Sequence, residues 1–253
     1  MLQLFSEREL ETFHQQGFVV VRSLYEGAQL EKLKTWTDEV QSWPEVPGKY
    51  MMYFEDSLLD SGKRVLSRIE NFCPYHEGLN DLTNGEKMIQ RISELFGEPS
   101  VLFKEKINFK MPGGNGFTPH QDAQAGWNDY ASLFITVLIA IDESTVENGC
   151  LELAAGHHQR GLIGELWKPL TEENMNGMDF ISVPTKPGDA VFFDSYVPHR
   201  SGPNLTDCPR RVLYLTYNRR SEGDSRIQYY ADKRRSYPPD IEREPDRNYI
   251  FKV

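Results

Sequence analysis

An amphipathic helical pattern recurs three times in the first hundred residues. Ser6 and Glu9 form the S-x-x-E arrangement of a capping box, and the apolar residues after them keep helical spacing as far as Gly17. The same spacing returns over Ala28–Val40 and over Glu86–Phe96, where a glycine follows the last apolar residue. We therefore expect three helices, each with one apolar face for packing against the rest of the protein.

Short apolar segments separated by turn residues dominate after residue 100. Clusters such as P-G-G-N-G at 112–116 and K-P-G-D at 186–189 lie between them. With one earlier segment after the first helix, the predicted strands are Phe18–Val21, Val101–Lys110, Leu133–Ile141, Leu151–Leu153, Ile181–Val183, Ala190–Phe193 and Val212–Tyr217. This pattern predicts a mainly β fold, a sandwich or barrel core with flanking helices. A parallel α/β sheet is the weaker alternative, because the second half lacks alternating helical patterns.

The composition limits the partners and the location. The 253 residues include 28 Lys and Arg against 38 Asp and Glu, a formal net charge of −10. This charge disfavours a nucleic-acid partner, because phosphate neutralisation needs a surplus of basic side chains. No apolar run approaches the ~18 residues of a membrane span, and the first residues lack the pattern of a signal peptide. We therefore expect a cytoplasmic protein with neither a membrane nor a nucleic acid as partner.

Two histidines and one aspartate have the spacing of a metal site. In an extended segment His120 and Asp122 point to the same side, and His199 follows Asp122 by 77 residues, just past a predicted strand. Two histidines and one carboxylate form the facial triad of non-haem Fe(II) oxygenases, which leaves positions open for a co-substrate and dioxygen. Arg210 and Arg211 follow His199 by 11 and 12 residues. Either guanidinium would suit a carboxylate of 2-oxoglutarate, and strand parity alone does not choose between them.

Five longer motifs follow one another along the chain. They are E-x-x-x-F-H-Q-Q-G-F-V-V-V-R, F-K-M-P-G-G-N-G-F-T-P-H-Q-D, T-V-L-I-A-I-D-E-S-T-V-E-N-G-C-L, A-A-G-H-H-Q-R-G and K-P-G-D-A-V-F-F-D-S-Y-V-P-H-R-S-G-P-N, with P-R-R after the last. In order and spacing they resemble the phytanoyl-CoA dioxygenase-like family of Fe(II)/2-oxoglutarate-dependent oxygenases. The resemblance implies one domain over residues 1–253, with a double-stranded β-helix, or jelly-roll, core over about 101–220 and helical support and pocket wall over about 1–100.

The family also implies a chemistry and the residues for it. The iron ligands would be His120, Asp122 and His199, and Arg210 with Ser201 would hold the far carboxylate of 2-oxoglutarate. Such a dioxygenase uses Fe(II), 2-oxoglutarate and O2 to hydroxylate an unactivated C–H bond, and it releases succinate and CO2. The carboxylate of Asp122 favours hydroxylation, because family members that halogenate have a small residue at that place.

The residues expected around the substrate come from two segments. Gln124 and Trp127 follow the first ligands, and Arg68 and Asn71 lie upstream in K-R-V-L-S-R-I-E-N-F. Basic groups and an indole suit a small polar or zwitterionic substrate, whose cation would stack on Trp127. Further basic or polar candidates on one strand face, for the substrate, for 2-oxoglutarate or simply for a solvated surface, are Lys104, Lys106 and Asn108.

One loop indicates the class of substrate. The segment H-Q-D-x-x-A-G-W resembles that of the family's aminoalkylphosphonate hydroxylases, which implies 2-aminoethylphosphonate or an N-methylated relative. Alternatives within the class are an amino acid, a betaine or a secondary metabolite. Two alternatives lie outside the class of 2-oxoglutarate-dependent hydroxylases. One is a redox-neutral epimerase or isomerase on a metal-binding jelly roll, and the other is a non-catalytic sandwich in which the triad is accidental. The spacing of Arg210 from His199 argues against both. No pattern indicates an oligomeric state.

Overall fold

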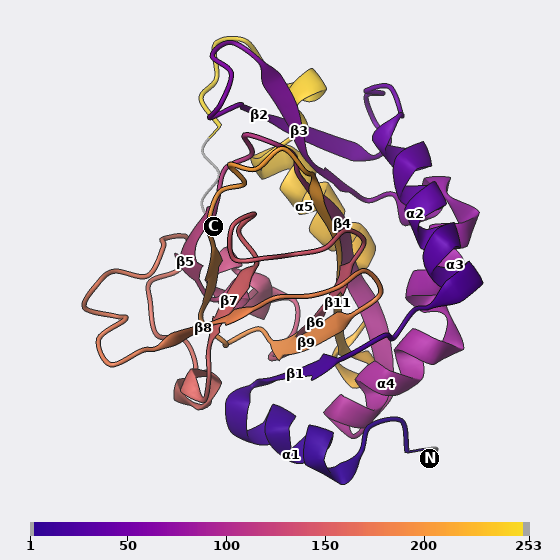
Figure 1. Cartoon of the computed structure of the whole chain (residues 1–253), viewed down its shortest axis with the longest axis vertical. Coiled ribbons are helices and arrows are strands. Elements are labelled where there is room, and N and C mark those ends of the chain that lie inside the picture. The colour runs from indigo at the N-terminus through magenta and orange to yellow at the C-terminus, as the bar shows by residue number, and fades with distance from the viewer. Residues whose placement is uncertain (1–2, 250–253) are drawn as a thin grey trace.

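Two antiparallel sheets form the centre of the computed structural model, which describes residues 3–249 (Figure 1). The larger sheet has the strand order β1 (Phe18–Val21), β9 (Ala190–Asp194), β6 (Phe134–Ala140), β11 (Arg210–Arg219), β4 (Ser100–Lys110), β3 (Arg64–Glu70) and β2 (Met51–Asp56). The smaller sheet has the order β5 (Phe117–His120), β10 (His199–Ser201), β7 (Leu151–Ala154) and β8 (Phe180–Val183). The prediction of a mainly β fold with flanking helices is confirmed.

The α-helices of the described chain agree with the predicted helices where a prediction existed. They are α1 (Glu7–Gln16), α2 (Gly27–Gln41), α3 (Glu77–Asn84), α4 (Glu86–Phe96) and α5 (Arg226–Ser236). At the start of α1 the Ser6 hydroxyl accepts from the Glu9 backbone N–H while the Glu9 carboxylate accepts from that of Ser6. None of the helices within residues 3–249 is long and apolar enough to cross a membrane.

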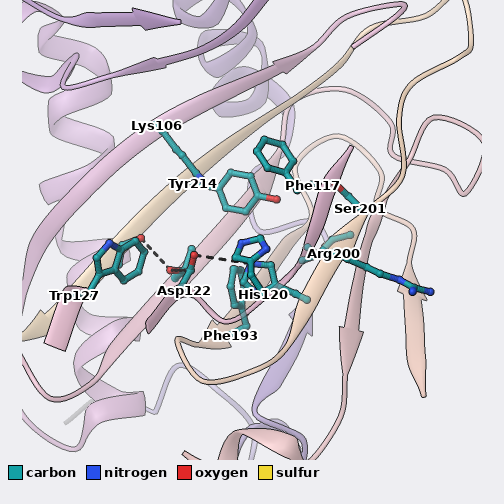
Figure 2. Close-up of a pocket in the computed structure, with 13 residues that line it drawn as sticks. Lys106, Phe117, His120, Asp122, Trp127, Phe193, Arg200, Ser201 and Tyr214 are labelled. Atoms are coloured by element: carbon teal, nitrogen blue, oxygen red, sulfur yellow. Dashed lines mark hydrogen bonds and ion pairs between the residues drawn. The ribbon is translucent and has the colours of Figure 1, made fainter. Parts of the chain in front are cut away.

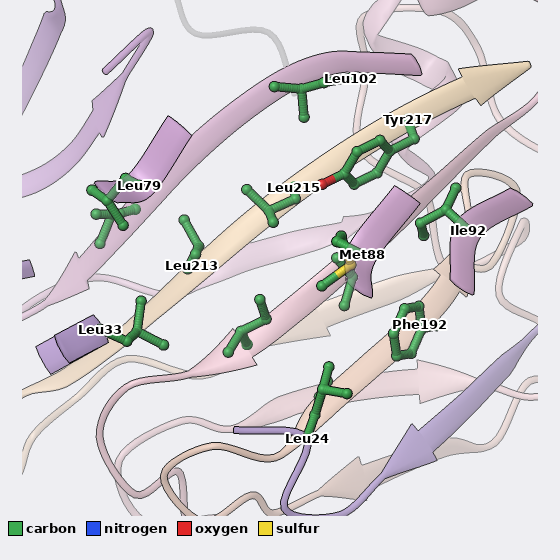
Figure 3. Packing of buried hydrophobic residues seen from close by; sticks show 14 of the residues in the cluster. Leu24, Leu33, Leu79, Met88, Ile92, Leu102, Phe192, Leu213, Leu215 and Tyr217 are labelled. Atoms are coloured by element: carbon green, nitrogen blue, oxygen red, sulfur yellow. The ribbon is translucent and has the colours of Figure 1, made fainter. Parts of the chain in front are cut away.

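Helices α2, α3 and α4 cover the face of the larger sheet that is turned away from β5, β7 and β8 (Figure 1). Leu33 of α2, together with Met88 and Ile92 of α4, packs with Leu213 and Leu215 of β11 in one apolar cluster (Figure 3). All five of these side chains are fully buried. Because this face is sealed by apolar packing, the opposite face of the same sheet is left for polar chemistry.

The alternation of side chains along β11 shows which of Arg210 and Arg211 points between the two sheets, a choice that strand parity in the sequence left open. Leu213 and Leu215 belong to the outer cluster under the helices, whereas Val212 and Tyr214 pack between the two sheets. The Arg211 side chain therefore faces outward, where it pairs with Asp142 at 2.8 Å and reaches Asp38 of α2. Arg210 faces inward and is 2% exposed.

Several elements were not predicted. Strands β2 and β3 pair with one another and extend the larger sheet beyond β4, so the first hundred residues hold a strand hairpin as well as helices. Their segments M-M-Y-F-E-D and R-V-L-S-R-I-E lack regular alternation, and β2 changes register partway along. Strands β5 and β10 are four and three residues long, too short to stand out as a periodic pattern.

We expect the outer cluster to supply much of the stability. Replacing Leu215 with Ala leaves a cavity under α3 and α4 and lowers the free energy of unfolding by about 2–5 kcal/mol in urea denaturation. The matched control is Leu58→Ala, because Leu58 is 52% exposed whereas Leu215 is fully buried; we expect a change within about 0.5 kcal/mol there. Equal effects from the two variants would contradict the packing described.

Candidate active site

Strands β5 and β10 bring the two predicted histidine ligands together. In the antiparallel register His120 lies directly opposite His199, and their ring centroids are 4.2 Å apart. Gln121 after His120 is extended, with φ −108° and ψ 137°, so that Asp122 returns to the same side as His120. Asp122 is not on a strand; it begins a short 3-10 turn over Asp122–Ala125. One potential ligand atom from each of the three residues lies within 4.8 Å of the other two.

Hydrogen bonds to the backbone orient both imidazoles. Nδ1 of His120 lies 2.6 Å from the carbonyl oxygen of Thr118, and Nδ1 of His199 lies 2.9 Å from that of Val197. A carbonyl only accepts, so each Nδ1 carries the proton and each Nε2 keeps its lone pair. Nε2 of His199 is 3.9 Å from Oδ1 of Asp122. The lone pair of each Nε2 is thus available to a metal, and that of His199 lies close to the carboxylate.

Two buried threonines orient the carboxylate. The Thr136 hydroxyl of β6 donates to Oδ2 of Asp122 at 3.1 Å, and it lies 3.0 Å from the Thr216 hydroxyl of β11. Because the single proton of Thr136 is used on Asp122, Thr216 must donate to Thr136. Sequence reasoning missed both residues. The available signal was a lone polar side chain inside an apolar strand, as in F-I-T-V-L-I-A and V-L-Y-L-T-Y.

The electrostatics of the site favour the protonation states that bind a metal. Burial, with help from the neighbouring His199, lowers the pKa of His120 to about 3, and burial also lowers the pKa of His199. Burial alone would raise the pKa of Asp122, but the electrostatic interactions of this carboxyl with His199 and Lys106 outweigh that effect, and its pKa is lowered. Neutral imidazoles and an ionised carboxylate therefore prevail at neutral pH. This donor set and its clustering fit an Fe(II) facial triad with open positions.

A cavity opens directly over the three ligands (Figure 2). Phe193 and Tyr214 form part of its wall, and Lys106 points from β4 toward the ring of Tyr214, with its ammonium 4.9 Å from the ring centre. Ser201 lines the same cavity. The remaining lining residues are Phe117, His120, Asp122, Trp127, Thr136, Leu151, His199, Arg200 and Thr216.

Basic and hydroxyl groups gather behind Tyr214. Nζ of Lys110 donates to Oγ of Ser201 at 2.7 Å, and the buried Arg210 guanidinium is hydrogen-bonded to Tyr214 and to Ser144. Burial and the charge of Arg210 lower the pKa of Lys110 to about 6. Within this cluster Ser201 and Tyr214 line the cavity, and Arg210 and Lys110 contact them from behind.

A second cavity shares its wall with the first. Both are lined by Lys106, Phe117, His120, Asp122 and Trp127. The second is also lined by Arg68, Glu70, Lys104 and Ala125. We call this second cavity the basic chamber. Arg68 and Lys104 are buried and Lys106 is half-buried. Desolvation together with repulsion from Lys104 lowers the pKa of Lys106 to about 7.

The structure brings two of the four predicted substrate residues to the basic chamber, Arg68 and Trp127. Gln124 is instead fully buried beside the loop, where its amide accepts from the backbone of Gln121 and donates to two carbonyl groups. Asn71 accepts from Arg226 of α5 and lines neither cavity. These two amides thus already have hydrogen-bond partners within the chain, and neither lines one of the two cavities.

Of the three polar candidates on β4, only two line a cavity. Lys104 and Lys106 line the basic chamber, whereas Asn108 is buried in the sheet between β3 and β11 and lines neither cavity. The ammonium of Lys104 lies 5.2 Å from the centre of the Trp127 ring. The Trp127 ring, which we expected to contact a substrate cation, has a lysine of this chain as a cation–π partner in the structure.

Comparison with known proteins identifies the class. The phytanoyl-CoA dioxygenase (PhyH) family matches residues 13–212. The chain is 42% identical to 2-aminoethylphosphonate dioxygenase of uncultured bacterium HF130_AEPn_1, over 98% of this chain and 95% of that protein. It is also 42% identical to methylphosphonate hydroxylase of Gimesia maris, over 92% and 88%. The solved structure of EctD from S. alaskensis with 2-oxoglutarate and 5-hydroxyectoine superposes with a TM-score of 0.72 at 20% identity, over 86% of this chain and 77% of that one.

The chain belongs to the phytanoyl-CoA dioxygenase (PhyH) family. It is a non-haem iron dioxygenase that uses 2-oxoglutarate and O2, and the prediction of this class and these cofactors is confirmed. The jelly-roll fold is confirmed by the likeness to EctD. The triad and the two adjoining cavities are therefore interpreted as an oxygenase active site.

We expect the hydrogen bond from Thr136 to be needed for metal affinity. Thr136→Val removes the donor that holds Asp122 and weakens Fe(II) binding by about 10–100-fold in anaerobic calorimetry. The control is Thr37→Val, because Thr37 is also buried but its hydroxyl bonds to a carbonyl of α2; its Fe(II) affinity stays that of the unaltered protein. Unchanged affinity in Thr136→Val would refute this role.

Proposed function

We propose that this dioxygenase hydroxylates a C–H bond of a small phosphonate. One atom of O2 enters the substrate as a hydroxyl group and the other enters succinate, while carbon 1 of 2-oxoglutarate leaves as CO2. His120, Asp122 and His199 hold the metal in this proposal. The bound iron supplies open coordination positions and the redox chemistry.

The observation that carries the substrate class is the basic chamber beside the triad. Arg68 and Lys104 are 5% and 7% exposed and line a space that also touches His120 and Asp122. Buried cations are costly unless an anion compensates them. A phosphonate offers three oxygens for guanidinium and ammonium donors, and its carbon would then face the metal. The names of the two relatives at 42% identity support this class.

The size of the space supports a small substrate. The two cavities have volumes of about 30 Å³ each, well below the several hundred Å³ that enclose a drug-sized ligand. A long acyl-CoA does not suit such a space.

In the same proposal, 2-oxoglutarate binds on the side of Tyr214. Arg210 and Ser201, supported by Lys110, take the far carboxylate, which leaves the 2-oxo acid end toward the metal ligands. The inward direction of Arg210 and the outward pairing of Arg211 with Asp142 support this choice of arginine.

Substrate-dependent succinate release tests the reaction. With Fe(II), 2-oxoglutarate and O2, we expect methylphosphonate, propylphosphonate or 2-aminoethylphosphonate to raise succinate formation in a 1:1 ratio with hydroxylated product. Butyrate, a carboxylate of similar size, should not, and Asp122→Ala should abolish the phosphonate-dependent release. Phosphonates without effect, or turnover without succinate as a redox-neutral epimerase would give, would contradict the proposal.

The neighbouring arginines give a matched pair for the co-substrate. We expect Arg210→Gln to raise the KM for 2-oxoglutarate by about 30-fold or more, since losing one partner of a buried charge pair costs roughly 2–5 kcal/mol. Arg211→Gln changes an arginine on the outer face and should leave this KM unchanged, although it can lower thermal stability. Equal KM effects, or a larger effect from Arg211→Gln, would overturn the assignment.

A further inference from the structure

The one carboxylate that the basic chamber adds to the metal ligand Asp122 is already paired. Glu70 is fully buried, and Nζ of Lys233 donates to both of its oxygens, at 2.7 and 2.6 Å. Nε of Arg68 lies 2.9 Å from the same carboxylate. A substrate ammonium entering the chamber would therefore have to displace a cation of the protein to reach Glu70.

The aromatic surfaces at the chamber are occupied in the same way. The Lys104 ammonium lies 5.2 Å from the Trp127 ring and 5.5 Å from the Tyr229 ring. The Arg68 guanidinium lies 4.4 Å from the Tyr53 ring. These contacts are the cation–π positions that a protonated or methylated amine would use. Here side chains of the chain itself fill them.

Charge is unbalanced in favour of anions. Within the described chain, Arg68, Lys104, Lys106 and Lys233 surround a single carboxylate outside the metal site, that of Glu70. A like charge brought next to such a group costs several kcal/mol when both are desolvated. An ammonium two carbons from a phosphonate held here would lie among these cations.

We propose that the chamber selects simple alkylphosphonates, which are purely anionic, and discriminates against phosphonates with an ammonium group. This inference rests on the proposed function and names its substrate class more narrowly. Lys104 excludes a second cation from the aromatic faces, and Lys233 keeps Glu70 from binding one. Both act as specificity-determining residues.

Lys233 contacts Glu70, in the wall of the chamber, from a helix. It lies on α5, beyond residues 13–212 that match the family, and α5 packs against β4. A second buried ion pair fixes this helix, because Arg226 at its start pairs with Glu105 of β4, which is fully buried. These contacts hold Lys233 against Glu70, so one residue of the proposed charge selection lies outside the part of the chain that matches the family.

A matched pair of substrates isolates the charge. Propylphosphonate has a methyl group where 2-aminoethylphosphonate has an ammonium group, so the two differ in charge at nearly equal size. With saturating 2-oxoglutarate, we expect the unaltered enzyme to show a kcat/KM at least about tenfold higher for propylphosphonate. Equal values, or a preference for 2-aminoethylphosphonate, would overturn the inference and leave the proposed function intact. Succinate release with none of the phosphonates would defeat the proposed function itself.

Two substitutions test the residues. Lys104→Met frees the faces of Trp127 and Tyr229, and Lys233→Met frees Glu70, so each should shift the ratio of kcat/KM values toward 2-aminoethylphosphonate by about tenfold or more. Thermal denaturation identifies a variant that does not fold. In that case the other variant and the unaltered enzyme still test the proposed selectivity. The control is Lys34→Met on the exposed side of α2, which should leave the ratio unchanged. A folded variant with the ratio of the unaltered enzyme would contradict the role of that lysine.

Discussion

Pairing of β5 with β10 is the constraint on which the active site depends. These strands are short, yet their register sets His120 opposite His199 and turns both rings through backbone hydrogen bonds. The carboxylate comes from outside the pair, on the turn that follows β5, and the hydroxyl of Thr136 on the other sheet orients it. The triad residues therefore all belong to the smaller sheet or the turn after β5, and the larger sheet contributes the hydrogen bond that orients the carboxylate.

The two faces of the larger sheet differ in polarity. Its outer face is apolar and sealed by helices, which supplies hydrophobic stabilisation. Its inner face carries lysines along β4, and desolvation is the main cause that lowers the pKa of Lys106 to about 7 and that of Lys110 to about 6. Such a row is unfavourable for folding. It is understandable where anionic substrates provide the missing countercharge.

Most of the scaffold and the grouping of the candidate metal triad could be predicted from the sequence, because each has a local signature. The capping box before α1, the glycine after α4 and the H-x-D of the triad are read over a few residues. The prediction did not extend to side chains whose role depends on distant partners. Gln124 is used by carbonyl groups of Glu165 and Lys168, some forty residues away in sequence.

The basic chamber illustrates the same limit. Trp127 was expected to meet a cationic substrate, but the register of β4 brings Lys104 to its face. Lys233 comes from a helix that no pattern indicated, and its partner Glu70 lies on an unpredicted strand. The charge of the chamber thus depends on contacts between side chains of different strands and helices. The local sequence does not encode these contacts.

The central claim is that the site holds iron and 2-oxoglutarate together through the triad. Anaerobic absorption spectroscopy tests it most directly, because 2-oxoglutarate chelated to Fe(II) gives a weak visible charge-transfer band. We expect the band when both are added to the unaltered protein, a change in it when methylphosphonate follows, and no band with Asp122→Ala. An unaltered protein that binds Fe(II) and 2-oxoglutarate without the band, or an Asp122→Ala protein that retains it, would contradict the account.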